Sequence, residues 1–178
     1  MRIISGRYKG KRIMAPKKLP VRPTTDMAKE ALFNILNNQF YFQDLAIIDL
    51  FSGTGNISYE FASRGTQDIT SVDLDSSCIQ FISKTSKELG FDITAIKSDV
   101  FKFIDRTQLK ANIIFADPPY NFNDEQFARI SLLVFENELL LEGGTLIVEH
   151  SERTDLSDLP NYSESRKYGG NVFSFFED

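Results

Sequence analysis

The stretch Asp117-Pro118-Pro119-Tyr120 combines residue types that could hold a flat ring bearing an amino group. It follows the apolar run 113–116, which is typical of a buried strand. The prolines lack N–H donors and keep the residues before them extended. A carboxylate, a proline carbonyl and an aromatic face therefore meet at the carboxyl end of a strand, where α/β sheets bind ligands. Asp117 and the Pro118 carbonyl suit the two N–H bonds of the amino group, and Tyr120 could stack on the ring; a proline-rich turn without a ligand is the alternative.

A second candidate site is the turn 51–55, Phe-Ser-Gly-Thr-Gly, between a predicted strand over 45–50 and a predicted helix over 56–64. Strand, Gly-x-Gly turn and helix form the nucleotide-binding βα unit. Ser58 replaces the third glycine of the dinucleotide fingerprint, and no Gly-Lys-Ser/Thr follows, which excludes a phosphate loop. Asp49 would repel a pyrophosphate but could help hold a cationic ligand. The turn therefore indicates an adenosine without phosphates, unless the glycines only pack the helix on the strand.

Two further acids stand at the ends of predicted strands. Asp73 ends the run 69–73 and follows Gly53 by 20 residues, the spacing at which a carboxylate takes ribose hydroxyls. Asp99 and Val100 follow the run 93–96, where an acid could reach an adenine amino group.

Length and composition narrow the class of protein. The 178 residues fit one domain, or one domain with a small appendage. No apolar run approaches a membrane span, and the N-terminus lacks the apolar region of a signal peptide. One cysteine and one histidine exclude an internal disulfide and the usual zinc site, and agree with a cytoplasmic location. We expect Cys78 to be a small buried group on a helix and His150 to be structural.

The charge is distributed unevenly. The net charge is −5, but residues 1–23 contain eight basic residues and no acid, so the remainder carries 12 basic and 25 acidic residues. The eight are Arg2, Arg7, Lys9, Lys11, Arg12, Lys17, Lys18 and Arg22. Apolar stretches at 3–4 and 13–15 predict a hairpin turning near Lys9-Gly10. We interpret this segment as an arm that meets phosphates, with Tyr8 stacking on a base; a solvated tail or a lysine-protected edge hairpin is the alternative.

The remaining pattern alternates strands and helices. A helix starts at Thr24-Thr25-Asp26, a helix is predicted over 126–141, and a strand over 145–149 follows Gly143-Gly144. A terminal hairpin is predicted around 169–171. The expected fold is α/β: a Rossmann-like, doubly wound, mostly parallel seven-stranded sheet with an antiparallel C-terminal edge. The expected division is a basic arm over 1–23 and one domain over 24–178.

Together these motifs resemble a known enzyme class. The segments 49–55, 72–73 and 117–120, in that order, resemble class I S-adenosylmethionine-dependent methyltransferases that act on amino groups. The segments 1–10, 22–26 and 29–36, with Ser63-Arg64-Gly65 and Lys167-Tyr168-Gly169, resemble the bacterial family that methylates guanine N2 in small-subunit ribosomal RNA. The resemblance spans nearly the whole chain. The body is unusually acidic for such an enzyme, and Ser52 and Thr54 stand where Ala and Ser are common.

The resemblance implies a role for each matched position. The cofactor would be S-adenosylmethionine, bound by Asp49, Phe51, Gly53 and Gly55 on its methionine side, Asp73 and Leu74 at the ribose, Asp99 and Val100 at the adenine, and Asp117. The target guanine would be held by Asp117, Pro118, Pro119 and Tyr120. The RNA would be contacted by Arg2, Arg7, Tyr8, Lys9, Lys11, Arg12, Arg22 and Thr24. No metal is implied.

Other functions stay open on the sequence. A DNA adenine-N6 methyltransferase usually adds a target-recognition domain, for which 178 residues leave no room. A protein glutamine methyltransferase usually has Asn where this chain has Asp117. A non-catalytic RNA-assembly factor would not need Asp117 and Tyr120. We expect small-subunit ribosomal RNA or the assembling small subunit as partner, a monomer, and no membrane.

Overall fold

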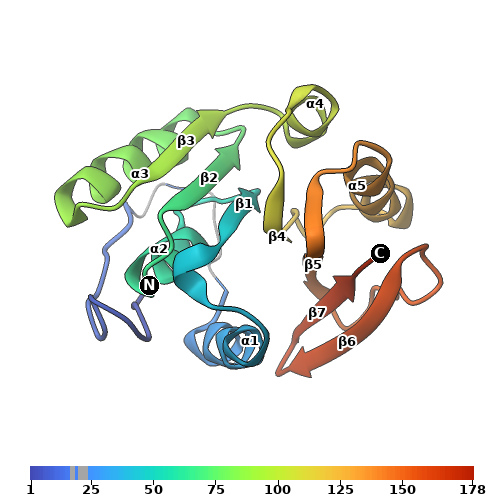
Figure 1. Cartoon of the computed structure of the whole chain (residues 1–178), viewed down its shortest axis with the longest axis horizontal. Coiled ribbons are helices and arrows are strands. Elements are labelled where there is room, and N and C mark those ends of the chain that lie inside the picture. Colours follow the sequence, from blue (N-terminus) through green and yellow to red (C-terminus); the bar gives the residue numbers. More distant parts are fainter. Residues whose placement is uncertain (17–18, 20–23) are drawn as a thin grey trace.

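The computed structural model describes residues 1–16, 19 and 24–178, and within them seven strands form one sheet. The sheet order is β3-β2-β1-β4-β5-β7-β6, parallel from β3 to β5 and antiparallel at β7 and β6 (Figure 1). The strands are β1 Ala46–Leu50, β2 Asp68–Asp73, β3 Ile93–Lys97, β4 Ala111–Ala116, β5 Leu140–Ser151, β6 Tyr162–Tyr168 and β7 Asn171–Phe176. The predicted fold class is confirmed.

Helices cover both faces of the sheet. They are α1 Asp26–Gln39, α2 Asn56–Ser63, α3 Ser76–Leu89, α4 Val100–Arg106 and α5 Asp124–Glu136, with a short 3-10 helix at Phe42–Asp44. In Figure 1, α1, α2 and α3 lie on one side of the sheet, and α4 and α5 on the other. The strand order reverses at β1, which pairs with β2 on one side and β4 on the other. The carboxyl ends of β1 and β4 therefore flank the switch point at which open α/β sheets bind ligands.

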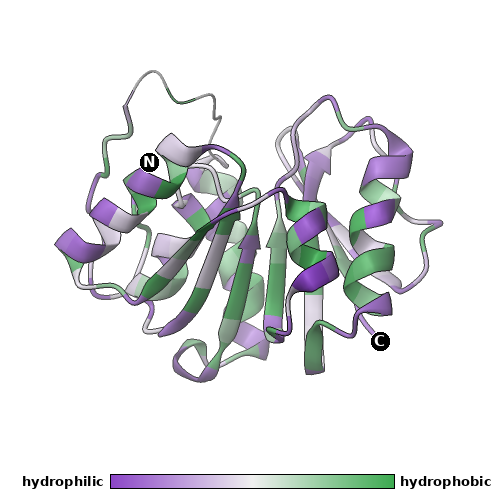
Figure 2. Ribbon diagram, turned by 90° about the horizontal axis from the view of Figure 1, so that it is seen from above, coloured by the Kyte–Doolittle hydropathy of each residue, from purple (hydrophilic) through white to green (hydrophobic). Residues whose placement is uncertain are grey.

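The core is built by side chains that alternate between the two faces. Ile113 and Phe115 of β4 join the cluster beneath α1 and α2, whereas Ile114 and Ala116 join the cluster beneath α4 and α5. Central parallel strands are buried on both sides and are largely apolar, as the green segments of the strands in Figure 2 show. This alternation decides which residues after each strand end face α1 and α2.

Two predicted boundaries were wrong. The helix predicted over 126–141 begins at Asp124 and ends at Glu136, and β5 begins at Leu140. Glu138 has a φ of +50°, which stops the helix, and Leu140 then pairs with Ala111 in the sheet. An apolar run such as 139–141 fits a buried helix or a strand equally well, so the sequence alone did not separate them.

The N-terminal arm is a hairpin with a wide turn. Arg2 and Arg12 form one antiparallel bridge, and the Gly10 N–H donates to the Ile3 carbonyl at 2.8 Å. The chain reverses over residues 5–10, not at Lys9-Gly10 alone. Ile3 and Ile13 are buried among side chains of α2 and α3, so the arm packs on the body. Among the described residues, no helix is both long and apolar enough to cross a bilayer.

Candidate active site

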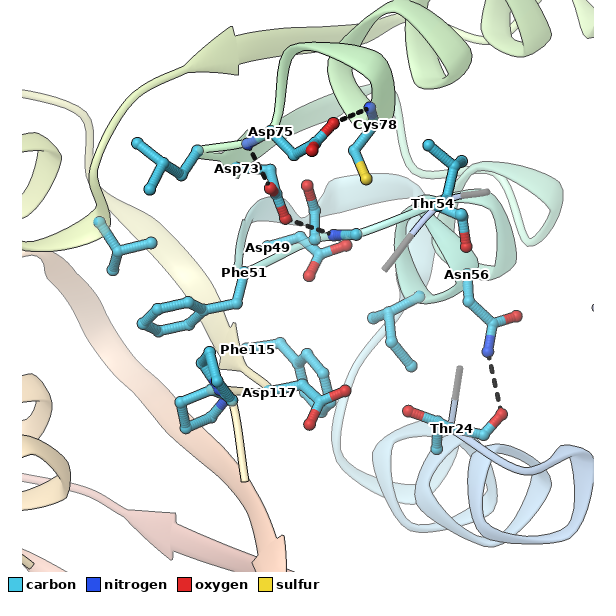
Figure 3. Close-up of a pocket in the computed structure, with 18 of the residues that line it drawn as sticks. Thr24, Asp49, Phe51, Thr54, Asn56, Asp73, Asp75, Cys78, Phe115 and Asp117 are labelled. Carbon is cyan, nitrogen blue, oxygen red and sulfur yellow. Dashed lines mark hydrogen bonds between the residues drawn. The ribbon is translucent and has the colours of Figure 1, made fainter. Parts of the chain in front are cut away.

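A cavity of about 720 Å³ opens at the carboxyl ends of β1, β2 and β4 (Figure 3). It is lined by most of the predicted cofactor and target residues: Asp49, Phe51, Gly53, Asp73, Leu74, Asp99, Val100, Asp117, Pro118, Pro119 and Tyr120. The volume lies within the range typical of ligand sites, about 300–1,000 Å³. The structure therefore brings together residues that are up to 71 positions apart in the sequence, from Asp49 to Tyr120.

Asp49 is the most deeply placed carboxylate of this cavity. Its side chain is 2% exposed and accepts a 2.5 Å hydrogen bond from the Ser58 hydroxyl, which itself lies 2.7 Å from the Ser71 hydroxyl. Burial raises the pKa of Asp49 to about 7, although the hydrogen bond from Ser58 opposes this rise. A positively charged ligand next to Asp49 would favour its ionised form. Ser58, which departs from the dinucleotide fingerprint, here orients the carboxylate.

Asp73 organises the glycine turn. One carboxylate oxygen accepts the Gly53 N–H and the other the Asp75 N–H, each at 2.8 Å (Figure 3). Gly53 has a φ of +51°, and the preceding Phe51 has a φ of +58°, a conformation that costs a bulky residue about 1–3 kcal/mol. Such strain is typical of functional sites. Asp73 thus holds a strained turn open beside the cavity.

The far end of the cavity is framed by Asp99, Val100 and aromatic rings. Asp99 caps α4, and one of its oxygens accepts the Lys102 N–H at 3.0 Å. Phe101 and Phe122 lie stacked with centroids 6.1 Å apart, and both line the cavity. The ring of Phe122, in the loop before α5, packs against three other phenylalanines. A flat ring such as adenine fits this apolar end.

The Asp117-Pro118-Pro119-Tyr120 segment forms the opposite wall. Pro118 is buried, Asp117 is half-buried, and Tyr120 is 68% exposed at the mouth. The pKa of Asp117 is raised well above its usual range, first by burial and then by the negative charges of Glu149 and Asp49. None of the described residues lining this cavity is a lysine or an arginine. The carboxylates are therefore left for a cationic ligand to neutralise.

Sequence reasoning missed Glu149 as a site residue. Asp117 and Glu149 directly follow the registered pair Ala116 and Val148, so Asp117, just past the end of β4, lies beside Glu149 in β5. Glu149 is 4% exposed and accepts hydrogen bonds from the Thr24 hydroxyl at 2.6 Å and from the Asn171 amide. Burial raises its pKa, and these two hydrogen bonds oppose the rise. Only the β4–β5 register could have revealed this neighbour.

Thr24, which is predicted to contact RNA, is part of the cavity wall, and its contact with RNA stays a prediction. Its side chain is buried, and its hydroxyl is committed to Glu149. Its carbonyl accepts the side-chain amide of Asn56 at 3.1 Å, which further fixes it at the cavity wall (Figure 3). Thr24 therefore supports the site from inside the protein.

The predicted RNA contacts of the arm lie apart from the cavity. Five basic side chains are exposed on the arm: Arg2, Arg7, Lys9, Lys11 and Arg12. Tyr8 anchors the arm to α3: its hydroxyl donates to the Leu89 carbonyl at 2.8 Å, and its ring packs edge-on against Phe91. Its ring is half-buried, and its stacking on a base stays a prediction. Arg22 lies outside the described residues.

Three other residues have structural roles. Gly55 does not line the cavity; it precedes α2 with a φ of +83°, and a Cβ there would lie 3.0 Å from the side chains of Ile82 and Tyr59. Cys78 is buried on α3, and burial raises its pKa to about 12, as expected of an inert thiol. His150 is buried and lies 2.8 Å from the Ser174 hydroxyl, in agreement with its predicted structural role.

Comparison with known proteins places this geometry in a family. The protein family described as Conserved hypothetical protein 95 matches residues 1–177. The chain belongs to this family. It is 31% identical to the putative rRNA methyltransferase YlbH of Bacillus subtilis, over 89% of this chain and 86% of that protein. It is 29% identical to ribosomal RNA small subunit methyltransferase D of Escherichia coli strain K12, over 97% of this chain and 86% of that protein.

A solved structure has a similar fold over almost the whole chain. The structure described as putative methyltransferase yhhF from Escherichia coli superposes with a TM-score of 0.86 at 25% identity, and the match covers 99% of this chain and 96% of that one. The fold, the family and the site together make this chain a methyltransferase.

Proposed function

We propose that this methyltransferase transfers a methyl group from S-adenosylmethionine to the N2 amino group of a guanine in small-subunit ribosomal RNA. The observation that carries the proposal is the placement of Asp49, Asp73 and Asp117 in one cavity beside Pro118 and Tyr120. The cavity therefore combines residues suited to an adenosine on one wall with hydrogen-bond acceptors for an amino group on the other.

The donor set of the cavity fits S-adenosylmethionine. That molecule carries positive charges on its sulfur and amino groups and has no phosphate, and the described lining offers carboxylates and no basic side chain. Asp73 would hold the ribose hydroxyls, Asp99 and Val100 the adenine, and Asp49 the methionine side. When bound, S-adenosylmethionine supplies a methyl carbon activated by a positive sulfur. The protein therefore needs to position the acceptor more than to activate it.

The acceptor wall suits an exocyclic amino group. The Asp117 carboxylate and the Pro118 carbonyl would accept the two N2–H bonds and favour a tetrahedral nitrogen that can attack. These acceptors also stabilise the positive charge that develops on that nitrogen. Tyr120, which is exposed at the cavity mouth, would stack on the target base once the base is turned out of its stack.

The proposed substrate rests on the relatives and the arm. Two relatives carry names that place them on ribosomal RNA. The exposed basic side chains of residues 1–16 would meet RNA phosphates, which an acidic body cannot do. We propose that residues 1–23 contact RNA and residues 24–178 carry the catalysis. We further propose a cytoplasmic monomer whose partner is small-subunit RNA or the assembling small subunit.

The test is transfer of labelled methyl groups from S-adenosylmethionine. Unmodified small-subunit RNA, partly assembled small subunits and duplex DNA are offered separately, and the modified nucleoside is identified. We expect N2-methylguanosine in RNA or in particles. N6-methyladenine in DNA, a methylated glutamine in protein, or cofactor binding without transfer to any substrate would each overturn the proposal.

The variant Asp117→Ala sharpens the assay. We expect the turnover of methyl transfer to fall at least about a hundredfold, as when a preorganised acceptor is removed, while the affinity for the cofactor changes little. The matched control is Asp124→Ala, because this acid begins α5 shortly after Tyr120 but is exposed and does not line the cavity. Unchanged turnover in Asp117→Ala would remove Asp117 from the mechanism.

A further inference from the structure

Glu149 is a buried carboxylate that the proposed mechanism does not yet use. It lies next to Asp117 in the sheet and on the same face, because Phe115 and Ile147, two residues earlier in each strand, pair with one another and both face α1 and α2. A second cavity of about 20 Å³, with room for about one water molecule, is lined by both acids together with Pro118 and Tyr120. Glu149 is therefore a direct neighbour of the predicted acceptor site.

The surroundings of Glu149 hold it without neutralising it. One oxygen accepts the Thr24 hydroxyl and the other the Asn171 amide, and both donors are uncharged. No lysine or arginine is among the described residues that line either cavity, and Glu149 forms no ion pair within the described chain. Two adjacent carboxylates, one buried and one half-buried, are costly without a cation. Such a cost is typical of a functional pair.

The proposed reaction needs a group that removes a proton. As the N2 lone pair forms the new N–C bond, the C–S bond breaks and its electron pair stays on sulfur. The nitrogen then holds the methyl group, a positive charge and both of its protons. One of these protons must leave to give N-methylguanine. Asp117, which accepts an N2–H bond in the proposed complex, is in reach of that proton.

Resting on this proposed function, we infer that Glu149 is a positioning residue for the proton transfer. Its carboxylate, fixed by Thr24 and Asn171, faces Asp117 and makes Asp117 a better proton acceptor. Asp117 takes the proton from the methylated nitrogen and becomes a carboxylic acid, and the Glu149 charge stabilises that acid. Thr24 and Asn171 come from opposite ends of the chain, and both serve to aim this one carboxylate.

The charge of the cofactor also affects the protonation of Asp117. A positive ligand in the cavity favours the ionised form of Asp117, which is the form that accepts N2–H bonds. The other titratable groups that face the pair are Asp49 on β1, Tyr120 after β4 and His150 on β5, and Asp155 lies against His150. Among the charged groups around Asp117, those of Glu149 and Asp49 raise its pKa.

The decisive variant is Glu149→Gln, in which the amide oxygen still accepts the Thr24 hydroxyl but the charge is gone. We measure kcat against pH from 5 to 9, with KM for RNA and for the cofactor. We expect kcat to fall at least about tenfold, in line with lost proton-transfer catalysis, and its acid limb to move to lower pH. Both KM values stay within about threefold, because the contact surface is unchanged.

The control is Glu152→Gln. Glu152 follows β5, is exposed, and pairs with Lys167, so the variant removes the same charge from the same region without touching Asp117. Its kcat and its acid limb stay at wild-type values. A lower kcat of Glu149→Gln with an unmoved acid limb, or a change in KM alone, would overturn the inference in favour of a structural role.

Two further measurements keep the inference testable if Glu149→Gln folds poorly. Thr24→Val removes one donor to Glu149, favours its neutral form, and moves the acid limb in the same direction. Calorimetry in buffers of different ionisation enthalpy counts the protons released on binding S-adenosylmethionine or its uncharged-sulfur product. We expect the wild type to release more protons on binding S-adenosylmethionine than on binding the product, and we expect this difference to be smaller in Thr24→Val. An equal difference in the two proteins would overturn the inference.

The outcomes separate the two proposals. If the wild-type protein transfers no methyl group to RNA, the proposed function fails. If the wild type transfers methyl to guanine N2 and Glu149→Gln has the same pH profile, only the role of Glu149 fails.

Discussion

The ammonium of Lys29 lies 3.4 Å from the carboxylate of Glu60, and the two side chains are 1% and 0% exposed. The same ammonium donates to the Arg2 carbonyl at 2.7 Å and to the Asn56 side-chain oxygen at 2.8 Å. Asn56 in turn donates to the carbonyl of Thr24, whose hydroxyl holds Glu149. A buried ion pair on α1 and α2 therefore joins the backbone of the arm to the wall of the candidate site.

Replacing Lys29 tests the energetic weight of this junction. We expect Lys29→Met to lower the free energy of unfolding by about 2 kcal/mol, because Glu60 keeps Arg64 but loses its second cationic partner, and the Arg2 carbonyl loses its donor. Urea denaturation followed by circular dichroism measures the change. The control Lys84→Met removes an exposed amine 3.9 Å from Glu88 and should stay within about 0.5 kcal/mol of wild type. Equal stability of both variants would contradict the assigned role of the ion pair.

The sequence predicted best what local signals decide. Helix α3 is set by such signals, because Asp75 caps its first turn and Gly90, with a φ of +64°, closes it. The acids at the ends of β1, β2 and β4 were found for a similar reason: each directly follows a strand that is apolar enough to recognise. Strand ends and turn residues are properties of a few consecutive positions.

Tertiary relationships account for what the sequence did not predict. Glu149 belongs to the site only because β5 lies beside β4 in a particular register, and Thr24 reaches it across 125 residues. Lys29 is buried because α1 packs its position against Glu60, although a lysine in a helix reads as exposed. Tyr8 reads as a free aromatic residue among basic ones, yet Leu89 and Phe91 engage it.

The docking of the arm depends on one glycine. Gly6 has a φ of +79°, and a Cβ there would lie 1.9 Å from the Ser63 carbonyl oxygen, which accepts the Arg7 N–H at 2.7 Å. We expect Gly6→Ala to detach residues 5–10 from α2, so that amide hydrogens of this segment exchange at least about tenfold faster. Exchange measured by mass spectrometry reports the change.

A second glycine supplies the matched comparison for Gly6. Gly10 has a φ of +83°, but a Cβ there would meet nothing within 4 Å. Gly10→Ala therefore carries only the backbone cost of the left-handed conformation, about 1 kcal/mol, and leaves the arm docked. If both alanine variants exchanged alike, close approach to Ser63 would not be what fixes the arm.

The pH dependence of stability tests the buried carboxylate of Asp49. Its pKa is about 7 in the folded protein and near 3.8 when unfolded, so between these values the folded state binds more protons. The free energy of unfolding therefore falls as the pH rises from about 4 to about 7. Asp117 and Glu149 act in the same direction, because their pKa values are also raised. We expect Asp49→Asn, which keeps an acceptor for the Ser58 hydroxyl, to be more stable than wild type at pH 8 and to have a flatter profile.

We expect Asp49→Asn, although more stable at pH 8, to bind the cofactor more weakly than the wild type does. At pH 8 the ionised Asp49 is costly in the empty protein but is neutralised by a cationic ligand, so Asp49→Asn should bind S-adenosylmethionine at least about tenfold more weakly while gaining stability. The control Asp44→Asn removes an exposed acid that does not line the cavity. Its stability and its affinity for the cofactor should therefore stay unchanged. Thermal unfolding and calorimetric titration on the same samples give the two quantities. A variant that loses both stability and affinity would mean that Asp49 supports the fold of β1, whereas opposite signs identify a carboxylate retained for its ligand.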